Sequence, residues 1–430
     1  MGHFNDQLGM RRSYYAATAH AAPNTAALEG EARADVVVVG AGCTGLAAAR
    51  TAASQGRRVI VLEGGEIGWG ASGRNGGQMI PGLRIGAAGL IKAYGFDQAK
   101  RLLDLADSAR DEVVSLIQSE AIDCDLKLTG HLNTAVREGD LADMREEYAC
   151  LTERMDYPHV QLLDADAVRA EVAHPYVGGL LHTNGGHLHP LNYTLGLAHA
   201  AAKAGARIYT RSPARSVERS GSGVEVRTAH GVVRADACVL AGDALLGSVD
   251  RKLEAHIMPV ANYIAVTKPL PNPNEIIMRD RAVSDSRFVV NYFRLAADGR
   301  LIFGGGERYT TDPPSDMAAF VRPFLQRTFP QLAGVEIDYA WGGMVSITRS
   351  RLPHIGRDGP IYWAHGYSGM GVILSTLAGR ILADAIDGRA ANVDLFASVA
   401  PHAFPGGAAF RGPLHLLAML WFSLRDRIGV

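Results

Sequence analysis

The chain has 430 residues, enough for two or three domains at about 150 residues each. Hydrophobic residues make up 47% and charged residues 20%, which excludes a disordered chain, and the 49 glycines show no collagen period. With 43 Lys and Arg against 44 Asp and Glu, the chain lacks the basic excess of a nucleic-acid binder, so we expect no nucleic-acid partner.

Signals for export and for covalent cross-linking are weak. Arg11 and Arg12 stand where an export signal would carry twin arginines, but no apolar region follows them. We therefore interpret residues 1–34 as an N-terminal arm that lies on the first domain. The four cysteines, at 43, 124, 150 and 238, are far apart and form no C-x-x-C pair. This usage favours a reducing, cytoplasmic location and predicts neither a metal site nor a disulfide framework.

Residues 35–39 (DVVVV) predict a strand buried on both faces, followed by G-x-G-x-x-G, a helix and a second strand that ends at Glu63. This βαβ unit is typical of dinucleotide binding. Gly40 permits the tight turn, Gly42 lets the backbone approach a pyrophosphate, and Gly45 allows close packing of helix and strand. Glu63 is expected to accept hydrogen bonds from ribose hydroxyls, which argues against NADP. The expected contacts of this unit are Gly40, Gly42, Cys43, Thr44, Gly45 and Glu63.

The next segment favours FAD over NAD. Residues 64–78 contain seven glycines in fifteen positions, and they offer many backbone N–H groups along an extended ligand. Trp69, Arg74 and Asn75 interrupt the glycines, which argues against a flexible linker. The expected contacts from this loop are Gly64, Gly70, Ala71, Ser72, Arg74, Asn75, Gly76, Gly77 and Gln78.

Further elements follow along the chain. Residues 90–121 predict a long helix, because apolar positions 102, 106, 109, 113 and 116 recur at spacings of three and four. A second helix is expected over 192–204, and three strands are expected within 257–309, at NYIAVT, RFVVNYFRL and RLIFGGG. Another helix begins near Gly371. The C-terminal tail, 397–430, contains the apolar run Leu414–Leu424, about half the length of a membrane span. We expect an apolar helix there that suits a membrane-surface or partner contact, and no transmembrane segment.

Several strings spread along the chain carry a family likeness. They are SYYAATA (13–19), VVVVGAGCTGLAAA (36–49), VLEGGEIGWGASGRNGGQ (61–78), FGGGERY (303–309), WGGMVSITRSRLPHIGR (341–357), GYSGMGV (366–372) and FPGGAAFRGPL (404–414). On these residues the chain resembles the D-amino-acid-oxidase/glycine-oxidase superfamily of FAD enzymes, and more closely its γ-glutamylputrescine oxidase-like branch.

The resemblance implies an α/β fold with a Rossmann-type FAD-binding domain and an interleaved α+β substrate domain with an antiparallel sheet, like glycine oxidase and sarcosine oxidase. The FAD-binding domain would comprise 35–88, 185–248 and 335–396, and the substrate domain 89–184 and 249–334. The flavin would be noncovalent, because 303–372 contains no Cys and the Gly-rich loop contains no His. The further FAD contacts that the resemblance implies are Ala214, Gly242, Gly369, Met370, Gly371 and Val372.

The implied reaction is oxidation of a C–N bond in an amine or amino acid. The substrate delivers hydride to flavin N5, the imine hydrolyses, and O2 is the expected acceptor, giving H2O2, so no strong general base is required. The first substrate guess is a γ-glutamylputrescine-like amine. The alternatives are an L-pipecolate- or sarcosine-like secondary amino acid oxidase, an amine dehydrogenase that reduces a quinone or carrier, and a non-enzymatic FAD-binding subunit. A monomer or a homodimer is expected.

Two departures from the family pattern affect the substrate. The branch usually reads GYSGHG, and Met370 replaces the His, which makes the expected pocket more apolar. Glycine-oxidase-like members have a carboxylate-binding Arg shortly after the W-x-G element, where this chain has Val345. A longer amine is therefore favoured over a small α-amino acid, unless another arginine substitutes. The candidate catalytic residues are Met370, Arg349, Tyr292, Arg294 and, for oxygen activation, Lys268, with Arg74 as a further substitute clamp. The histidines at 182, 187 and 189 are expected to hold no metal.

Overall fold

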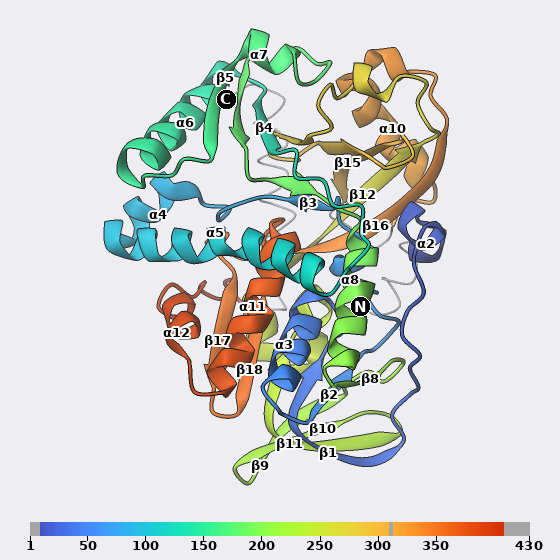
Figure 1. The fold of residues 1–430 in the computed structure, drawn as a ribbon, viewed down its shortest axis with the longest axis vertical. Coiled ribbons are helices and arrows are strands. Elements are labelled where there is room, and N and C mark those ends of the chain that lie inside the picture. The colour runs from blue at the N-terminus through green and yellow to red at the C-terminus, as the bar shows by residue number, and fades with distance from the viewer. Residues whose placement is uncertain (1–8, 309–312, 408–430) are drawn as a thin grey trace.

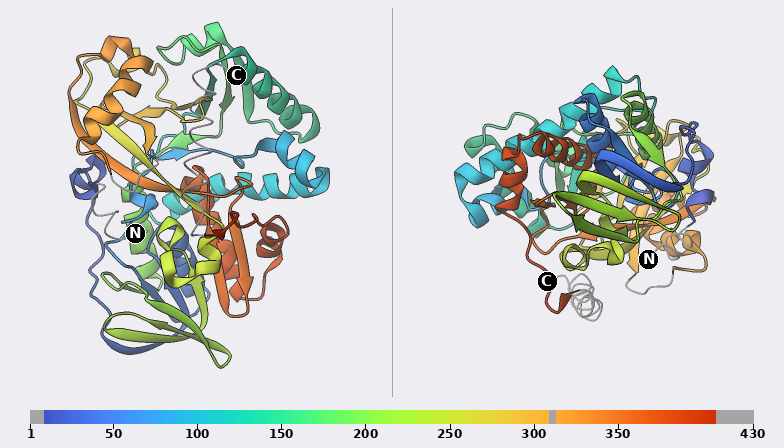
Figure 2. Two further views of the ribbon diagram at one scale, coloured as in Figure 1. Left: turned by 180° about the vertical axis from the view of Figure 1, so that it is seen from behind. Right: turned by 90° about the horizontal axis from the view of Figure 1, so that it is seen from below.

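The computed structural model describes residues 9–308 and 313–407, so the predicted apolar helix at 414–424 lies outside the described residues. Two eight-stranded sheets lie at opposite ends of the molecule, as Figures 1 and 2 show. Within the described ranges, no helix has the length and hydropathy of a membrane span.

The first sheet has the strand order β17-β18-β11-β1-β2-β8. The five strands from β18 to β8 run parallel to one another. Its strands are β1 (Gly30–Val39), β2 (Val59–Leu62), β8 (Arg207–Tyr209), β9 (Ser216–Ser220), β10 (Gly223–Arg227), β11 (Gly231–Leu240), β17 (His354–Asp358) and β18 (Ile361–His365). The helices on one face are α3 (Cys43–Ser54), α8 (Pro190–Lys203) and α11 (Gly371–Ile386).

Strand β1 is buried on both faces, as its apolar run predicted. Val36 and Val38 belong to the core under the helices, while Val37 and Val39 belong to a second core that includes β10 and β11. The strand begins at Gly30, five residues before the predicted start at Asp35, because Gly30–Ala34 pair with Gly231–Ala235 of β11. That pairing is a long-range contact, which the local apolar pattern does not encode.

The second sheet has the order β16-β12-β15-β14-β13-β4-β6-β5 and is antiparallel except where β13 pairs with β4. Its strands are β4 (His131–Ala135), β5 (Val160–Asp164), β6 (Gly178–His182), β12 (Met258–Thr267), β13 (Ala282–Asp285), β14 (Tyr292–Leu295), β15 (Leu301–Arg308) and β16 (Ile337–Ile347). The helices beside it are α6 (Glu138–Ala149), α7 (Ala165–Arg169) and α10 (Met317–Thr328). The predicted domain boundaries stay a prediction. Strand β16 lies within 335–396, which was predicted as part of the FAD-binding domain, but it pairs with β12 of this second sheet.

Helices α4 (Gly86–Tyr94) and α5 (Phe96–Ser119) cross the molecule between the two sheets (Figure 1). All five apolar positions that predicted the long helix are buried in α5, but the predicted start at residue 90 is wrong, because α4 ends at Tyr94 and the chain turns at Gly95 (φ +81°) before α5 begins. The short strands β3 (Gln78–Met79) and β7 (Gly186–His187) pair between the two halves. The remaining helices are α2 (Tyr14–Ala17), α9 (Arg251–Glu254) and α12 (Ala391–Ala397).

The N-terminal segment packs on the second sheet through α2. Ser13 caps this helix, its Oγ accepting from the Ala16 N–H at 3.0 Å. The Tyr15 ring is fully buried and meets the Trp341 ring edge-on, with centroids 5.0 Å apart. The start of the described chain is therefore fixed beside β16.

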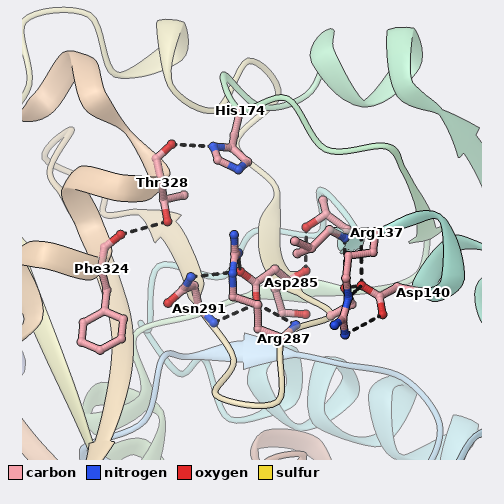
Figure 3. A network of polar contacts seen from close by, with 12 residues as sticks. Arg137, Asp140, His174, Asp285, Arg287, Asn291, Phe324 and Thr328 are labelled. Carbon is pink, nitrogen blue, oxygen red and sulfur yellow. Dashed lines mark hydrogen bonds and ion pairs between the residues drawn. The ribbon is translucent and has the colours of Figure 1, made fainter. Parts of the chain in front are cut away.

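The predicted strand over 287–295 is wrong in its first half. Residues 286–291 form a turn between β13 and β14. Asp285 holds this turn, because its carboxylate accepts from the Asn291 N–H and side-chain amide, both at 3.0 Å, and pairs with Arg287 (Figure 3). Ser286 donates to Asp140 at the start of α6 at 2.6 Å. Alternating apolar residues alone do not reveal such a buried polar anchor.

Candidate active site

A cavity of about 750 Å³ lies between the two sheets and is lined by residues from both. This volume falls in the usual range for cofactor and small-molecule sites. Most of the predicted cofactor contacts line it, although they come from five separate stretches of sequence. These lining residues are Gly40, Gly42, Cys43, Thr44, Glu63, Gly64, Gly70, Ala71, Ser72, Arg74, Asn75, Gly76, Gln78, Ala214, Gly242, Gly369, Gly371 and Val372.

The G-x-G-x-x-G turn connects β1 to the N-terminus of α3. Gly40 has φ +109°, and a Cβ there would lie 2.7 Å from the Ala241 carbonyl oxygen. A Cβ on Gly45 would overlap the Gly40 carbonyl oxygen and lie 3.1 Å from the Val38 side chain. Gly45 therefore serves helix–strand packing and does not line the cavity. Cys43 and Thr44 line the cavity, so the N-terminus of α3 opens on it, an arrangement suited to phosphate.

Glu63 lies at the carboxyl end of β2 and lines the same cavity. Its carboxylate accepts from the Ala41 N–H at 2.7 Å and from the Gly65 N–H at 2.8 Å. Burial raises the pKa of this carboxyl, and the backbone donors offset part of the increase. Since a carboxylate has about four acceptor sites, room is left for two further donors such as ribose hydroxyls.

The Gly-rich loop is held rigid by its own polar side chains. Ser72 Oγ accepts from the Cys43 N–H at 3.0 Å, which joins the loop to α3. The Asn75 amide donates to the carbonyls of Ala71 and Ser72 at 3.0 and 3.1 Å and accepts from the Gly77 N–H at 2.7 Å. Gly77 does not line the cavity, and a Cβ there would overlap the Leu188 carbonyl oxygen.

The GYSGMG segment precedes α11, whose N-terminus also opens on the cavity. The Tyr367 hydroxyl lies 2.6 Å from Thr44 Oγ1, in the first turn of α3. Burial raises the pKa of Tyr367, so its hydroxyl stays neutral. Gly369 and Gly371 line the cavity, but Met370 is buried in the core at the N-cap of α11 and does not. Its side chain packs with apolar residues, so we assign it no catalytic role.

Three other predicted catalytic residues also lie outside the cavity. Lys268 is exposed and pairs with Glu336 at 2.6 Å. Arg349 is exposed and donates to the Ala403 carbonyl at 3.2 Å. Arg294 is buried, and its guanidinium donates to four groups of the chain itself, which are Gly76 O at 2.7 Å, Leu295 O and Leu188 O at 3.0 Å, and Tyr15 Oη at 3.2 Å. Each side chain is engaged elsewhere, so none is retained as a substrate group.

Arg74 lines the cavity but is also committed to the fold. It donates to the Trp69 and Gly342 carbonyls at 2.7 and 3.1 Å, and its guanidinium lies 5.0 Å from the centroid of the Trp69 ring. These contacts join the Gly-rich loop to β16. A structural role for Arg74 therefore accounts for its burial.

Tyr292 is the predicted catalytic candidate that the structure brings into the cavity. Its hydroxyl donates to Asn262 Oδ1 at 2.6 Å, and its ring lies against Gly76 and Gly304, where no Cβ would fit. Burial raises the pKa of Tyr292, so the group is a neutral hydrogen-bond donor and not a base. It can position a ligand between the Gly-rich loop and the second sheet.

Sequence reasoning missed part of the cavity wall. These residues come from the second sheet, its turns and the loops that precede α4 and β17, and they are Arg84, Asn262, Phe288, Val290, Glu307 and Arg351. Glu307 and Arg351 lie within two of the family-like strings, but no local pattern assigned them to the cavity, because the register of β12, β15 and β16 brings these residues together. For example, Asn262 pairs with both Glu307 and Gly343.

The histidines of the 182–189 segment form ordinary structural contacts. The His187 ring lies 2.9 Å from the Asp280 carbonyl oxygen, and the His189 ring 2.9 Å from the Thr18 hydroxyl. In the described part of the chain, no cluster of three or more His, Cys, Asp or Glu side chains is placed to hold a metal ion.

The geometry fits FAD. Two helix N-termini and a half-buried carboxylate at a strand end form a dinucleotide cradle, and the cavity continues beyond it to the second sheet. Ala214 and Gly242 line the cradle near Glu63. The fold and site thus define a dinucleotide-binding protein whose second sheet also lines the site.

Residues 35–385 match the family of FAD dependent oxidoreductases (DAO), and the chain belongs to this family. It is an FAD-dependent oxidoreductase. The gamma-glutamylputrescine oxidoreductase of Escherichia coli is 40% identical over 423 residues, 97% of this chain and 99% of that protein. The probable oxidoreductase OrdL of Rhizobium meliloti is 37% identical over 417 residues, 96% of this chain and 97% of that protein.

The fold is that of glycine oxidase-like enzymes. The structure of glycine oxidase from Geobacillus kaustophilus superposes with a TM-score of 0.70 at 24% identity, covering 83% of this chain and 95% of that one. L-proline dehydrogenase from P. horikoshii superposes with a TM-score of 0.70 at 20% identity, covering 86% and 99%. The predicted fold class and cofactor are confirmed.

Proposed function

We propose that this protein oxidises the C–N bond of an amine, with a γ-glutamylputrescine-like compound as the first substrate to test. The observation that carries the proposal is the end of the cavity at the second sheet. There Val345 lines the wall where glycine-oxidase-like enzymes are expected to place their carboxylate-binding arginine, and Tyr292 supplies a neutral hydroxyl. The 40% identity to a gamma-glutamylputrescine oxidoreductase supports the same substrate class.

The roles of the chain's own groups follow from their chemistry. Bound FAD supplies the two-electron step by accepting a hydride from the carbon beside the nitrogen. The N–H groups at the start of α11 would face the pyrimidine end of the flavin and stabilise negative charge there. Tyr292 and Asn262 would orient the substrate amine, while Phe288 and Val290 would exclude water from it. No strong general base is part of the proposal.

We further propose O2 as the electron acceptor and a cytoplasmic location. All four cysteines are free and buried, which supports a reducing compartment. Burial raises the pKa of the Cys43 thiol beside the cavity, so this group is no nucleophile and a noncovalent flavin is favoured.

A substrate panel tests the proposal. The purified holoprotein is given γ-glutamylputrescine, putrescine, sarcosine, L-pipecolate and glycine, and peroxide release is measured alongside reduction of a soluble quinone. We expect the largest kcat/KM with γ-glutamylputrescine and peroxide as the product. A preference for glycine or sarcosine would contradict the substrate proposal. Turnover with the quinone and no peroxide release would show that the electron acceptor is a quinone and not O2.

A further inference from the structure

Two arginines and a glutamate from distant parts of the chain line the same cavity as Tyr292. Arg84 lies in the loop between β3 and α4, Arg351 in the loop between β16 and β17, and Glu307 near the end of β15. In the sheet register Glu307 pairs with Asn262, whose side chain accepts from the Tyr292 hydroxyl. Glu307 therefore lies at the Tyr292 end of the cavity, and its charge acts on both arginines.

Arg84 and Arg351 differ from the other arginines of the site in what their guanidinium groups contact. Arg294 and Arg74 donate to backbone carbonyls of the fold. By contrast, within the described residues neither Arg84 nor Arg351 makes a side-chain hydrogen bond or ion pair. Arg84 is exposed and Arg351 is half-buried, and both line the cavity. As far as the described residues go, both guanidinium groups keep their donors for a ligand.

The charges also interact with one another. Burial is the main cause that lowers the pKa of each guanidinium. The Arg351 charge lowers the pKa of Arg84 further, whereas the Glu307 charge raises the pKa of both arginines. Both groups remain charged, because arginine does not lose its proton in proteins. Two cations that repel each other in one cavity are unfavourable for folding alone, and a bound anion would relieve the repulsion.

The backbone at Arg351 is also unusual. This residue has φ +63°, a left-handed conformation that is unfavourable for a side chain of this size. The turn is held by the Arg351 N–H, which donates to the Thr348 carbonyl at 3.3 Å, and by the Thr348 hydroxyl, which donates to the Leu352 carbonyl at 2.7 Å. Strained residues of this kind concentrate at ligand sites. Here the strained turn presents a guanidinium to the cavity.

We propose that Arg84 and Arg351 bind the carboxylate of an amino-acid head group on the substrate, with Glu307 facing its ammonium group. Guanidinium forks match carboxylates in geometry and charge. Because Val345 offers no cation beside the W-x-G element, the carboxylate would lie away from the C–N bond that is oxidised. A γ-glutamyl amide of a diamine has this separation of groups. The identity of the substrate rests on the proposed function, but binding of the amino-acid head group can be measured without any reaction.

Binding of a ligand without an oxidisable terminal amine tests the subsite directly. The probe is γ-glutamyl-n-butylamide, which keeps the amino-acid head and lacks the distal amine, and n-butylamine serves as the head-less control. Calorimetric titration into the holoprotein gives Kd for the wild type, Arg84→Gln, Arg351→Gln and their Lys variants. Arg357→Gln is the matched control, because Arg357 pairs with Asp394 and does not line the cavity.

We expect Arg84→Gln and Arg351→Gln each to weaken probe binding about 10- to 100-fold, as loss of a charge-assisted hydrogen bond implies. The Lys variants should restore part of the probe affinity, because lysine keeps the positive charge but lacks the two-pronged guanidinium. Arg357→Gln should bind like the wild type. Since both cavity arginines repel each other, the two Gln variants should melt at the wild-type temperature or above it, with full FAD content.

The outcomes separate the two proposals. Arginine-dependent binding of the probe without oxidation of γ-glutamylputrescine would support the subsite and reject the proposed function. Equal affinity in wild type and both Gln variants, or no binding of the probe to the wild type, would overturn the subsite even if the enzyme oxidised simple amines.

Discussion

The hydroxyls of Thr44 and Tyr367 lie 2.6 Å apart and join two helix N-termini that are more than 300 residues apart in the sequence. Thr44 belongs to the first turn of α3 and Tyr367 to the loop that precedes α11. The two helices pack closely along their length, since a Cβ on Gly379 would lie 2.7 Å from the Ala48 nitrogen. The cradle for FAD is thus one rigid unit built from both ends of the chain.

Loss of this hydroxyl contact should weaken the cradle. Tyr367→Phe removes one buried hydrogen bond, so we expect a loss of about 1 kcal/mol in the free energy of unfolding and FAD binding weakened by about fivefold. Thermal melting and FAD titration of the apoprotein measure the two effects. Tyr362→Phe is the control, because its half-buried hydroxyl makes no hydrogen bond with the described residues. Equal behaviour of the two variants would refute the role of Tyr367.

Close packing at Gly45 should be intolerant of any side chain. In Gly45→Ala the new Cβ would overlap the Gly40 carbonyl oxygen, which displaces α3 from β1. We expect a loss of about 3 kcal/mol or more and a protein that purifies without flavin. Gly139→Ala in α6 is the matched control, because a Cβ there meets nothing within 4 Å. That variant should be as stable as the wild type or slightly more so. A yellow, stable Gly45→Ala protein would be inconsistent with this packing.

The ionised form of Glu63 should control FAD affinity. Ribose hydroxyls donate to the carboxylate, so protonation of Glu63 removes binding energy, and burial raises the pKa at which this happens. FAD affinity of the apoprotein should therefore decrease as the pH falls, beginning above the ordinary carboxyl range of about 4.3. Glu63→Gln should bind at least about tenfold more weakly at neutral pH. It should also lose this part of the pH dependence. Parallel pH profiles for the two proteins would exclude Glu63 as the group responsible.

The turn between β13 and β14 should depend on Asp285. Asp285→Ala removes the acceptor for Asn291 and the partner of Arg287, in a side chain that is fully buried. We expect a loss of about 3 kcal/mol in urea unfolding and a higher KM, because Phe288 and Val290 of this turn line the cavity. Asp166→Ala, whose exposed carboxylate pairs with Arg169, should change stability by less than about 0.5 kcal/mol. Similar losses in both variants would contradict the anchoring role.

The cofactor half of the site was predictable because its signals are local. A strand, three spaced glycines, a helix and Glu63 occur within about 30 residues, which is one βαβ unit. The Gly-rich loop follows at once, and most of its predicted contact residues line the cavity. Helix α5 was predictable for the same reason, since its buried positions repeat within one element.

The substrate half was not predictable because long-range packing decides where its side chains point. Arg294 and Lys268 have suitable chemistry. However, Arg294 donates to the Gly76 carbonyl of the Gly-rich loop and the Tyr15 hydroxyl of the arm, and Lys268 pairs with Glu336 on the surface. Conversely, Arg84 has no motif around it. It becomes a candidate ligand group only when the loop before α4 meets β15 and the β16–β17 loop.

Anaerobic reduction of the flavin tests the central claim most directly. The holoprotein is mixed with γ-glutamylputrescine without oxygen, and its flavin absorbance is followed in time. The account predicts full bleaching of the oxidised flavin band, with recovery and release of peroxide when air is admitted. An oxidised flavin spectrum that stays unchanged with this and every other amine tested would contradict it.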